Sequence, residues 1–339
     1  MSLLSVRNLV IDYPRTRALD GADLTLEPGE SLGLVGESGS GKSTLGSAVG
    51  RLLPTTARRT DGEVLVAGEP VFELPAARLR HLRRKHLGFV FQDPIASLDP
   101  TMRVGAQLRL VLGRGGDVGF HLARVRLDDP RVPRAYPHQL SGGMAQRVAI
   151  AMAMATSPEL LVADEPTAAL DSQVREEVSN VVFSLAAEAG TSILWLSHDL
   201  PAVARRCDRV AVMYGGRVVE SGPAREVLGD PAHPYTAALA GSAPAAAPHG
   251  VRLHPVPGRP PMLDGPSAGC AFAPRCAFAE ERCEHERPVP VRVREQDVLC
   301  HRAGELEGRL SPVDAVPQGG EVSPGGAVPR DDAVSEVKA

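Results

Sequence analysis

Gly36-Glu37-Ser38-Gly39-Ser40-Gly41-Lys42-Ser43 is the stretch that decides the fold of this chain of 339 residues. It fits the pattern of a P-loop and lies between an apolar run, 31–35, and a helical pattern. Glycines let the backbone form a concave nest whose N–H groups point at phosphate oxygens, and the following helix adds the positive end of its dipole. Lys42 would neutralise the β- and γ-phosphates of a nucleoside triphosphate, and Ser43 would offer a hydroxyl ligand to Mg²⁺. The alternative is a Gly-rich turn that only starts a helix.

Short apolar runs alternate with longer helical patterns from Leu3 to about Gly241, which is typical of an α/β domain. Two more apolar runs flank Gly215 and Gly216, which can adopt the positive φ angles of a two-residue turn and so predict a hairpin. Four runs predict strands that are covered on both faces: 31–35, 87–91, 160–164 and 192–197.

Two adjacent carboxylates follow one of these strands. Asp164 ends the run 160–164, and Glu165 comes next. Because strands of one open α/β sheet direct their carboxyl ends at the same crevice, both acids are expected beside the P-loop. Asp164 would hold Mg²⁺, and Glu165 would polarise the attacking water as a general base. The alternative is a pair of solvated turn residues.

A second candidate anion site, within 138–146, opens the helical run 147–156. Ser141 is a favoured N-cap residue, and Gly142 and Gly143 leave backbone N–H groups open. Since the P-loop already supplies one nest, a second nest indicates contact with a nucleotide held by another subunit. An ordinary capped helix is the alternative.

Five motifs occur together in an order that resembles ABC-type ATPases over residues 3–240. They are GESGSGKST (36–44), FVFQDP (89–94), LSGGMAQR (140–147), LLVADEPTAALD (160–171) and LSHDL (196–200). The resemblance implies an α/β P-loop NTPase fold with a mixed central sheet, a helical subdomain and an N-terminal antiparallel β subdomain. It also implies that two such subunits face each other head to tail with each ATP between them.

The resemblance assigns roles to single residues. Gln92 would sense Mg²⁺ and the γ-phosphate, His198 would hold the γ-phosphate and the attacking water in line, and Tyr13 would stack on adenine. Asp171 would report across the subunit interface. The catalytic residues would be Lys42, Glu165 and His198, and Mg²⁺ would lie at Ser43, Gln92 and Asp164. Ser141, Gly142 and Gly143 would contact the ATP held by the partner subunit. The chain's own ATP would contact the P-loop residues Gly36, Glu37, Ser38, Gly39, Ser40, Gly41, Lys42, Ser43 and Thr44.

The segments 230–244 and 257–283 resemble the C-terminal extension of oligopeptide and dipeptide permease ATP-binding subunits. This implies an ATPase that powers di- or oligopeptide import. Its expected partners are a second ATPase subunit, identical or paralogous, two transmembrane permease subunits and, indirectly, an extracytoplasmic substrate-binding protein. The expected location is peripheral, on the cytoplasmic face of the bacterial inner membrane. Alternatives are a transporter for nickel, drugs or antibiotics, a poorly active regulatory partner subunit, and a soluble ABC ATPase of translation or DNA repair.

Four cysteines crowd into the last quarter of the chain: Cys270, Cys276, Cys283 and Cys300. In a reducing cytosol, clustered thiols are more often metal ligands than disulfides. Their gaps of five, six and sixteen residues do not follow the paired Cys-x-x-Cys of common zinc sites. The resemblance implies a 4Fe-4S cluster; zinc, or an oxidised or metal-free module, are the alternatives.

Composition sets the remaining expectations. With 37 basic and 41 acidic side chains the chain carries a formal charge of −4, which argues against a nucleic-acid partner. No apolar run approaches the roughly 20 residues of a membrane-spanning helix, and no secretion signal is seen. Only 48 residues separate Gln92 from Ser141, so the helical subdomain expected between them is short, and the segment 113–119 interrupts it. In the family that this chain resembles, this subdomain meets the membrane partner. The expected regions are an ATPase domain, 1–241; a Pro/Ala-rich linker, 242–269; a cysteine module, 270–303; and a disordered tail, 304–339.

Overall fold

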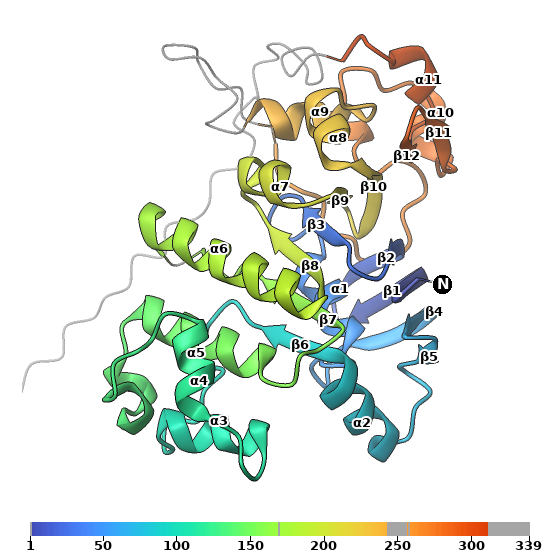
Figure 1. Ribbon diagram of the computed structural model, residues 1–339. Coiled ribbons are helices and arrows are strands. Elements are labelled where there is room, and N and C mark those ends of the chain that lie inside the picture. The colour runs from blue at the N-terminus through green and yellow to red at the C-terminus, as the bar shows by residue number, and fades with distance from the viewer. Residues whose placement is uncertain (1, 169, 243–255, 257, 311–339) are drawn as a thin grey trace, which may run out of the picture.

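The structure is a computed structural model that describes residues 2–168, 170–242, 256 and 258–310. Two sheets form its framework (Figure 1). One is antiparallel, with strand order β2-β1-β4-β5, and the other has eight strands in the order β11-β12-β10-β9-β3-β8-β7-β6. The strands are β1 Leu4–Tyr13, β2 Thr16–Leu26, β3 Ser31–Val35, β4 Arg58–Val66, β5 Glu69–Pro70, β6 Leu87–Val90, β7 Leu160–Asp164, β8 Ser192–Ser197, β9 Arg209–Tyr214, β10 Arg217–Pro223, β11 Val291–Val293 and β12 Gln296–Val298.

Helices cover the eight-stranded sheet and extend beyond one end of it. In Figure 1, α6 crosses in front of β7 and β8, while α3, α4 and α5 form a separate layer below. The helices are α1 Lys42–Val49, α2 Ala76–His86, α3 Val104–Leu112, α4 Val118–Arg124, α5 Gly142–Met154, α6 Ser172–Ala189, α7 Leu200–Arg206, α8 Ala224–Gly229, α9 Pro234–Gly241, α10 Glu281–His285 and α11 Ala303–Leu306. The predicted mixed sheet, antiparallel β subdomain and helical subdomain are therefore confirmed.

The four predicted buried strands lie side by side as parallel neighbours in the order β3-β8-β7-β6. Their apolar residues are buried because helices lie on one face and the antiparallel sheet packs with α1 on the other. Strand β6 ends one residue earlier than predicted, which leaves Phe91 exposed. The predicted hairpin is β9–β10, and its turn residues Gly215 and Gly216 have φ angles of 53° and 75°.

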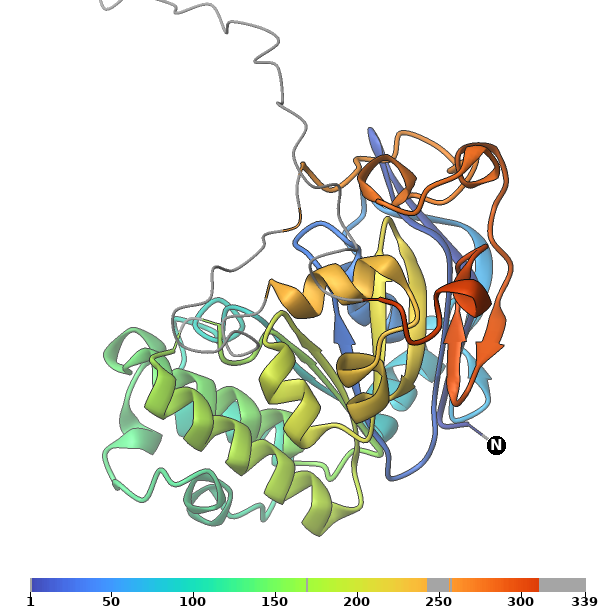
Figure 2. The same ribbon diagram turned by 90° about the horizontal axis from the view of Figure 1, so that it is seen from above.

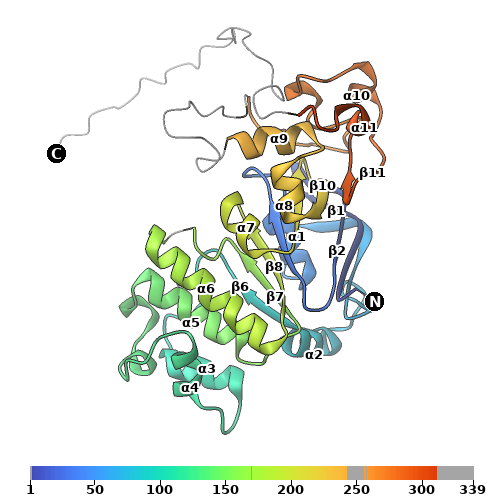
Figure 3. The same ribbon diagram turned by 45° about the horizontal axis from the view of Figure 1, so that its top comes forward.

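The cysteine region continues the central sheet. Strand β12 pairs antiparallel with β10, with Glu220 opposite Val298 and Ser221 opposite Asp297. Figure 2 shows this orange and red part of the chain beside the blue N-terminal strands, on the far side of the molecule from the green helices. In Figure 3, α8 to α11 gather at one end, opposite α3 and α4. The region expected as an appended module thus shares its sheet with the ATPase domain.

One predicted boundary needs correction. The tail was expected to be disordered from Gly304, but α11 covers Ala303–Leu306, and both of these end residues are buried. Burial of Ala303 and Leu306 gives this short segment a fixed place, while 311–339 lie outside the described residues. The linker has no regular secondary structure in its described part, as expected, yet it packs on the domain: Leu263 O accepts a hydrogen bond of 2.7 Å from Arg17 N in β2.

The helical layer is interrupted where the sequence indicated. Helix α3 ends at Leu112, and Gly113 and Gly115 then adopt positive φ angles of 78° and 88°. Asp117 starts α4 by accepting a hydrogen bond from Phe120 N. Within the described residues, none of the helices has both the length and the apolar character that crossing a membrane requires.

Candidate active site

Four loops at the carboxyl ends of neighbouring strands meet around one cavity of about 480 Å³. The P-loop follows β3, and Gln92, Glu165 and His198 follow β6, β7 and β8. All four segments line the cavity, as the order of strands in a parallel sheet requires. The predicted residues that line it are Ser38, Gly39, Gly41, Lys42, Ser43, Thr44, Gln92, Glu165 and His198.

The P-loop has a backbone that only glycine can build at its key positions. Gly36 and Gly41 have φ angles of 152° and 107°. A Cβ atom on Gly36 would lie 2.2 Å from Met213 O, and one on Gly41 would lie 2.6 Å from Ala18 O. Close approach of β9 and β2 to this loop therefore excludes a side chain at both positions.

Lys42 is buried and folded back on its own loop. Its Nζ donates hydrogen bonds of 2.8 Å to Gly36 O and 3.1 Å to Glu37 O. Burial lowers the pKa of Lys42, and the carboxylates of Glu165 and Asp164 oppose that shift. A phosphate group could accept from this ammonium in place of the carbonyls, which makes Lys42 a preorganised cation for an anionic ligand.

Ser43 and Asp164 present the ligands that Mg²⁺ prefers. Ser43 Oγ donates a hydrogen bond of 3.1 Å to Asp164 Oδ1. Burial raises the pKa of Asp164, and the neighbouring charge of Glu165 raises it further. A divalent cation beside this carboxylate would stabilise its charged form, so a hydroxyl and a carboxylate at hydrogen-bonding distance fit a Mg²⁺ ion.

Glu165 and His198 form a contact across the cavity. His198 Nδ1 lies 3.1 Å from Glu165 Oε2. Glu165 has a positive φ angle of 44°, and its N–H donates to Leu196 O at 3.0 Å, so β8 holds its backbone in an unusual conformation. Strain of this kind persists at functional sites when the surroundings fix it. The pair can accept a proton from a water molecule and hold that water in place.

The second candidate anion site lies apart from the cavity. Ser141 is the N-cap of α5 and accepts a hydrogen bond from Met144 N. Asp171 is the N-cap of α6 and accepts from Val174 N at 3.0 Å. Ser141, Gly142 and Asp171 are exposed, and neither they nor Gly143 line the cavity. They are therefore accessible to another molecule.

Four more predicted ATP ligands, Tyr13, Gly36, Glu37 and Ser40, are also absent from the cavity lining. Tyr13 is half-buried against the core of the antiparallel sheet. Ser40 is buried, and Glu37 pairs with Arg275 of the cysteine region. Gly36, Glu37 and Ser40 belong to the P-loop itself and shape it from outside the cavity. Their predicted contacts with ATP stay predictions.

One wall of the cavity was missed by sequence reasoning. It is formed by 16–18, by Gly215 and Gly216, and by 261–263. No sequence motif marks these residues. Gly215 and Gly216 reach the cavity through the β9–β10 turn, and 261–263, which were expected to be part of a linker, reach it by packing on β2. The single available signal was the resemblance of 257–283 to a C-terminal extension, which indicates order in that stretch.

The four clustered cysteines line a second, much smaller cavity of about 20 Å³. None forms a disulfide. Among the described residues, no three His, Cys, Asp or Glu side chains are arranged to hold one metal ion. Burial raises the pKa of Cys276 to about 12 and that of Cys300 to about 11, so these thiols keep their protons unless a cation compensates.

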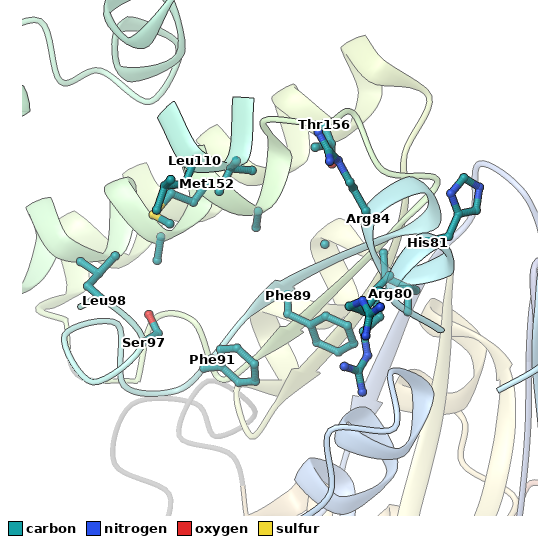
Figure 4. A pocket seen from close by; sticks show the side chains of 16 residues that line it. Arg80, His81, Arg84, Phe89, Phe91, Ser97, Leu98, Leu110, Met152 and Thr156 are labelled. Atoms are coloured by element: carbon teal, nitrogen blue, oxygen red, sulfur yellow. The ribbon is translucent and has the colours of Figure 1, made fainter. Parts of the chain in front are cut away.

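A third feature is a groove of about 760 Å³ between α2, β6 and the helical layer. Its floor is apolar, with Phe89 and Phe91 stacked at 5.9 Å between ring centroids, and Leu110 and Met152 lie on its helical side (Figure 4). Arg80 and Arg84 of α2 line the opposite side. Leu110 is 72% exposed, which is unusual for so large an apolar side chain.

Comparison with known proteins identifies two families along the chain. Residues 19–168 match the family described as ABC transporter. Residues 219–283 match the family described as Oligopeptide/dipeptide transporter, C-terminal region. The first range contains the P-loop, Gln92, Ser141 and Glu165.

Similar proteins cover most of the sequence. An oligopeptide transport ATP-binding protein of Salmonella typhimurium is 41% identical over 301 residues, which is 85% of this chain and 90% of the relative. An oligopeptide transport ATP-binding protein of Bacillus subtilis is 40% identical over 294 residues, or 82% of each chain.

Solved structures agree in fold. A dimeric ATP-binding cassette in a post-hydrolysis state, bound to ADP and phosphate, has a TM-score of 0.59 at 31% identity and covers 66% of this chain and 99% of its own. A Clostridium perfringens protein that is part of an ABC transporter complex has a TM-score of 0.59 at 30% identity, covering 67% of this chain and 91% of its own.

Proposed function

Because this chain belongs to the ATP-binding proteins of the oligopeptide/dipeptide ABC transporter family, we propose that it hydrolyses ATP to power import of di- or oligopeptides. The observation that carries the peptide assignment is the match of 219–283 to the C-terminal region of oligopeptide/dipeptide transporters. The ATPase assignment rests separately on the cavity that joins the P-loop to Glu165 and His198.

The geometry supports separate roles for the residues that line the cavity and for Asp164 beside Ser43. Lys42 would bind the β- and γ-phosphates, and Ser43 and Asp164 would hold Mg²⁺. Mg²⁺ would neutralise charge that develops on the phosphates. Glu165 would accept the proton of the attacking water, and His198, 3.1 Å from it, would keep that water in line. Positioning and charge stabilisation of this kind account for most of the catalysis of phosphoryl transfer.

A second ATPase subunit would complete the site. The exposed Ser141, Gly142 and Asp171 lie away from the P-loop cavity of their own chain, so they are available to a nucleotide held by a partner. The related cassette of known structure is dimeric. We propose a head-to-tail pair in which α5 presents its N-terminus to the γ-phosphate bound by the other subunit.

The groove at α2 and α3 fits the cytoplasmic helix of a permease subunit. Phe91, Leu110 and Met152 would contact its apolar face, and Arg80 and Arg84 would pair with acidic residues or with its negatively charged C-terminal end. Such docking would hold this chain peripherally on the cytoplasmic face of the inner membrane. Leu110→Glu should then abolish peptide-stimulated ATP hydrolysis by the assembled transporter and leave basal hydrolysis by the isolated chain unchanged. Equal stimulation in the variant would exclude the groove as the permease site.

We propose a 4Fe-4S cluster for the four cysteines, whose cavity of about 20 Å³ would have to widen to hold it. Each of its four irons takes one thiolate, so the sulfurs must surround a common space and need not converge on one point. Cys270, Cys276, Cys283 and Cys300 line one cavity, and no three of them are placed as ligands of a single ion. The cluster would cross-link α10, the segment before it and the segment that follows β12, which are too small to bury much apolar surface themselves.

Peptide uptake tests the function in the cell. A strain without this gene should lose uptake of a radiolabelled tripeptide, and the wild-type gene should restore it. Restoration by a Lys42→Ala variant would contradict the dependence on ATP. Unchanged tripeptide uptake together with lost nickel, drug or antibiotic transport would favour one of the other ABC substrates.

A further inference from the structure

The wall formed by 261–263 points to a subsite for the nucleoside. Lys42, Ser43, Glu165 and His198 bring all the phosphate chemistry to one part of the cavity. Another part of the lining carries no charged side chain: Ala18, Gly215, Gly216 and the stretch 261–263 are apolar or offer only backbone, and Thr16 adds a hydroxyl. An uncharged wall next to a phosphate site suits a base and a sugar.

Arg17 also lines this wall, but its charge is already paired with two carboxylates. Its Nε donates to Asp12 Oδ1 at 2.8 Å, and its Nη1 donates to Asp20 Oδ1 at 3.2 Å. Asp12 and Asp20 therefore hold the guanidinium, and Arg17 contributes its backbone and stem to the cavity.

The stretch 261–263 is anchored at Leu263, and the chain that follows it is anchored at Ser267. Leu263 O accepts a hydrogen bond of 2.7 Å from Arg17 N. A few residues on, Ser267 N donates to the buried Asp20 at 3.2 Å, and Ser267 O accepts from Arg287 Nε at 2.7 Å. Arg287 also pairs with Asp20. The segment is thus fixed to β2 and forms a permanent part of the cavity.

Met262 lies in this segment and has a largely exposed side chain. Among the exposed large apolar side chains of the described residues, it has the highest exposed fraction, 85%. Exposure of a thioether side chain is unfavourable unless a ligand covers it, and methionine sulfur makes favourable contacts with aromatic rings. Tyr13, the aromatic residue predicted for the base, does not line the cavity.

We infer that residues 261–263 form the nucleoside wall of the ATP cavity and that the Met262 side chain packs against the base. This inference rests on the proposed assignment of the cavity to ATP. It makes the C-terminal region, which follows the ATPase domain in sequence, a direct part of the nucleotide site. Because the contact is apolar and involves only a π-face, it should strengthen binding of any purine nucleotide with little discrimination between bases.

Calorimetric titration of the purified full chain with Mg-ATP and with Mg-tripolyphosphate tests this subsite. Met262→Ala should weaken Mg-ATP binding about three- to tenfold, as expected for the loss of one sulfur–aromatic contact. It should leave tripolyphosphate binding unchanged, since that probe has no base. Met262→Leu should retain most of the ATP affinity. Val289→Ala, which removes another exposed apolar side chain of the C-terminal region away from the cavity, should change neither affinity.

The outcomes separate the two proposals. Equal ATP affinity in Met262→Ala and wild type would overturn the subsite alone. Equal weakening of both ligands in Met262→Ala would also overturn it, because the residue would then act through the fold. A wild-type chain that binds neither ligand would contradict the ATP assignment itself.

Discussion

Arg275, the residue before Cys276, forms a two-pronged ion pair with Glu37 of the P-loop. Its Nη1 lies 2.7 Å from Glu37 Oε2, and its Nη2 lies 3.1 Å from Oε1. The same Nη1 donates to the Tyr214 hydroxyl at 3.0 Å, and the Tyr235 hydroxyl accepts from Glu37 N at 2.9 Å. The cysteine region is therefore joined directly to the P-loop.

This pair should stabilise the fold. Arg275 is 7% exposed, and its removal would leave the half-buried Glu37 carboxylate without its main partner. Arg275→Met should lower the free energy of unfolding by about 3 kcal/mol in urea titrations. Arg292→Met is the control, since Arg292 pairs with Asp297 on the surface at 57% and 55% exposure, and it should cost less than about 1 kcal/mol. Equal losses in the two variants would show that the Arg275 pair has no special weight.

Glu165 should control the chemical step without controlling ATP binding. Glu165→Gln keeps the size of the side chain and removes its ability to accept a proton. Its kcat for ATP should fall about 100- to 10,000-fold, while KM changes little. Glu188→Gln alters an exposed carboxylate paired with Arg124 outside the cavity and should keep full activity. A Glu165→Gln enzyme with kcat near wild type would assign the base to another residue.

Glu220 should make stability depend on pH. It is fully buried in β10 and accepts hydrogen bonds from Ala232 N at 2.8 Å and His233 N at 2.9 Å. Burial raises the pKa of Glu220 from 4.5 to about 7, with a smaller contribution from Asp230. The folded protein then holds this proton more tightly than the unfolded chain does. Its contribution to stability is complete below pH 4.5 and is lost as the pH rises through 7.

Glu220→Gln should remove that loss. Between pH 5 and pH 8 the free energy of unfolding of the variant should rise by about 2 kcal/mol relative to wild type, as measured by urea titration at each pH. The adjacent His233 has the opposite effect on the pH dependence of stability. Burial lowers the pKa of His233 to about 4, so its contribution to stability is present above pH 6.5 and is lost as the pH falls from there through 4. Since His233 is present in both proteins, it does not affect the difference. Parallel pH profiles of variant and wild type would contradict the raised pKa.

The cysteine cavity should hold iron. Protein purified without oxygen should show broad absorption near 400 nm and about four irons and four sulfides per chain, and Cys276→Ser should lose them. Cys207→Ala removes a buried thiol that does not line this cavity, and it should keep its iron. Colourless, iron-free wild-type protein would contradict the cluster, while zinc in its place would support the alternative metal.

Local patterns in the sequence were sufficient for the nucleotide-binding half of the site. The P-loop, Asp164, Glu165 and the buried strands each depend on neighbours within a few residues, so spacing and polarity predicted them. The predicted N-cap at Ser141 is of the same kind, since its hydroxyl accepts from a backbone N–H three residues later. Such short-range geometry is encoded locally.

Long-range packing was not predictable in the same way. The pairing of β12 with β10, the ion pair of Arg275 with Glu37 and the place of Met262 in the cavity all join residues far apart in the chain. Residues 258–267 show no apolar periodicity in the sequence. Hydrogen bonds to β2, at Arg17 N and at the buried Asp20, fix their position instead. A Pro-rich segment without pattern therefore suggested a linker where the structure has a wall.

Peptide-stimulated ATP hydrolysis tests the central claim most directly. The chain is assembled in liposomes with its permease subunits, its ATPase partner and the peptide-binding protein, and phosphate release is measured with and without an oligopeptide. Hydrolysis should be severalfold faster when the loaded binding protein is present, and that increase should be lost when this chain carries Glu165→Gln. Hydrolysis that does not respond to any peptide, or that responds instead to nickel or a drug, would contradict it.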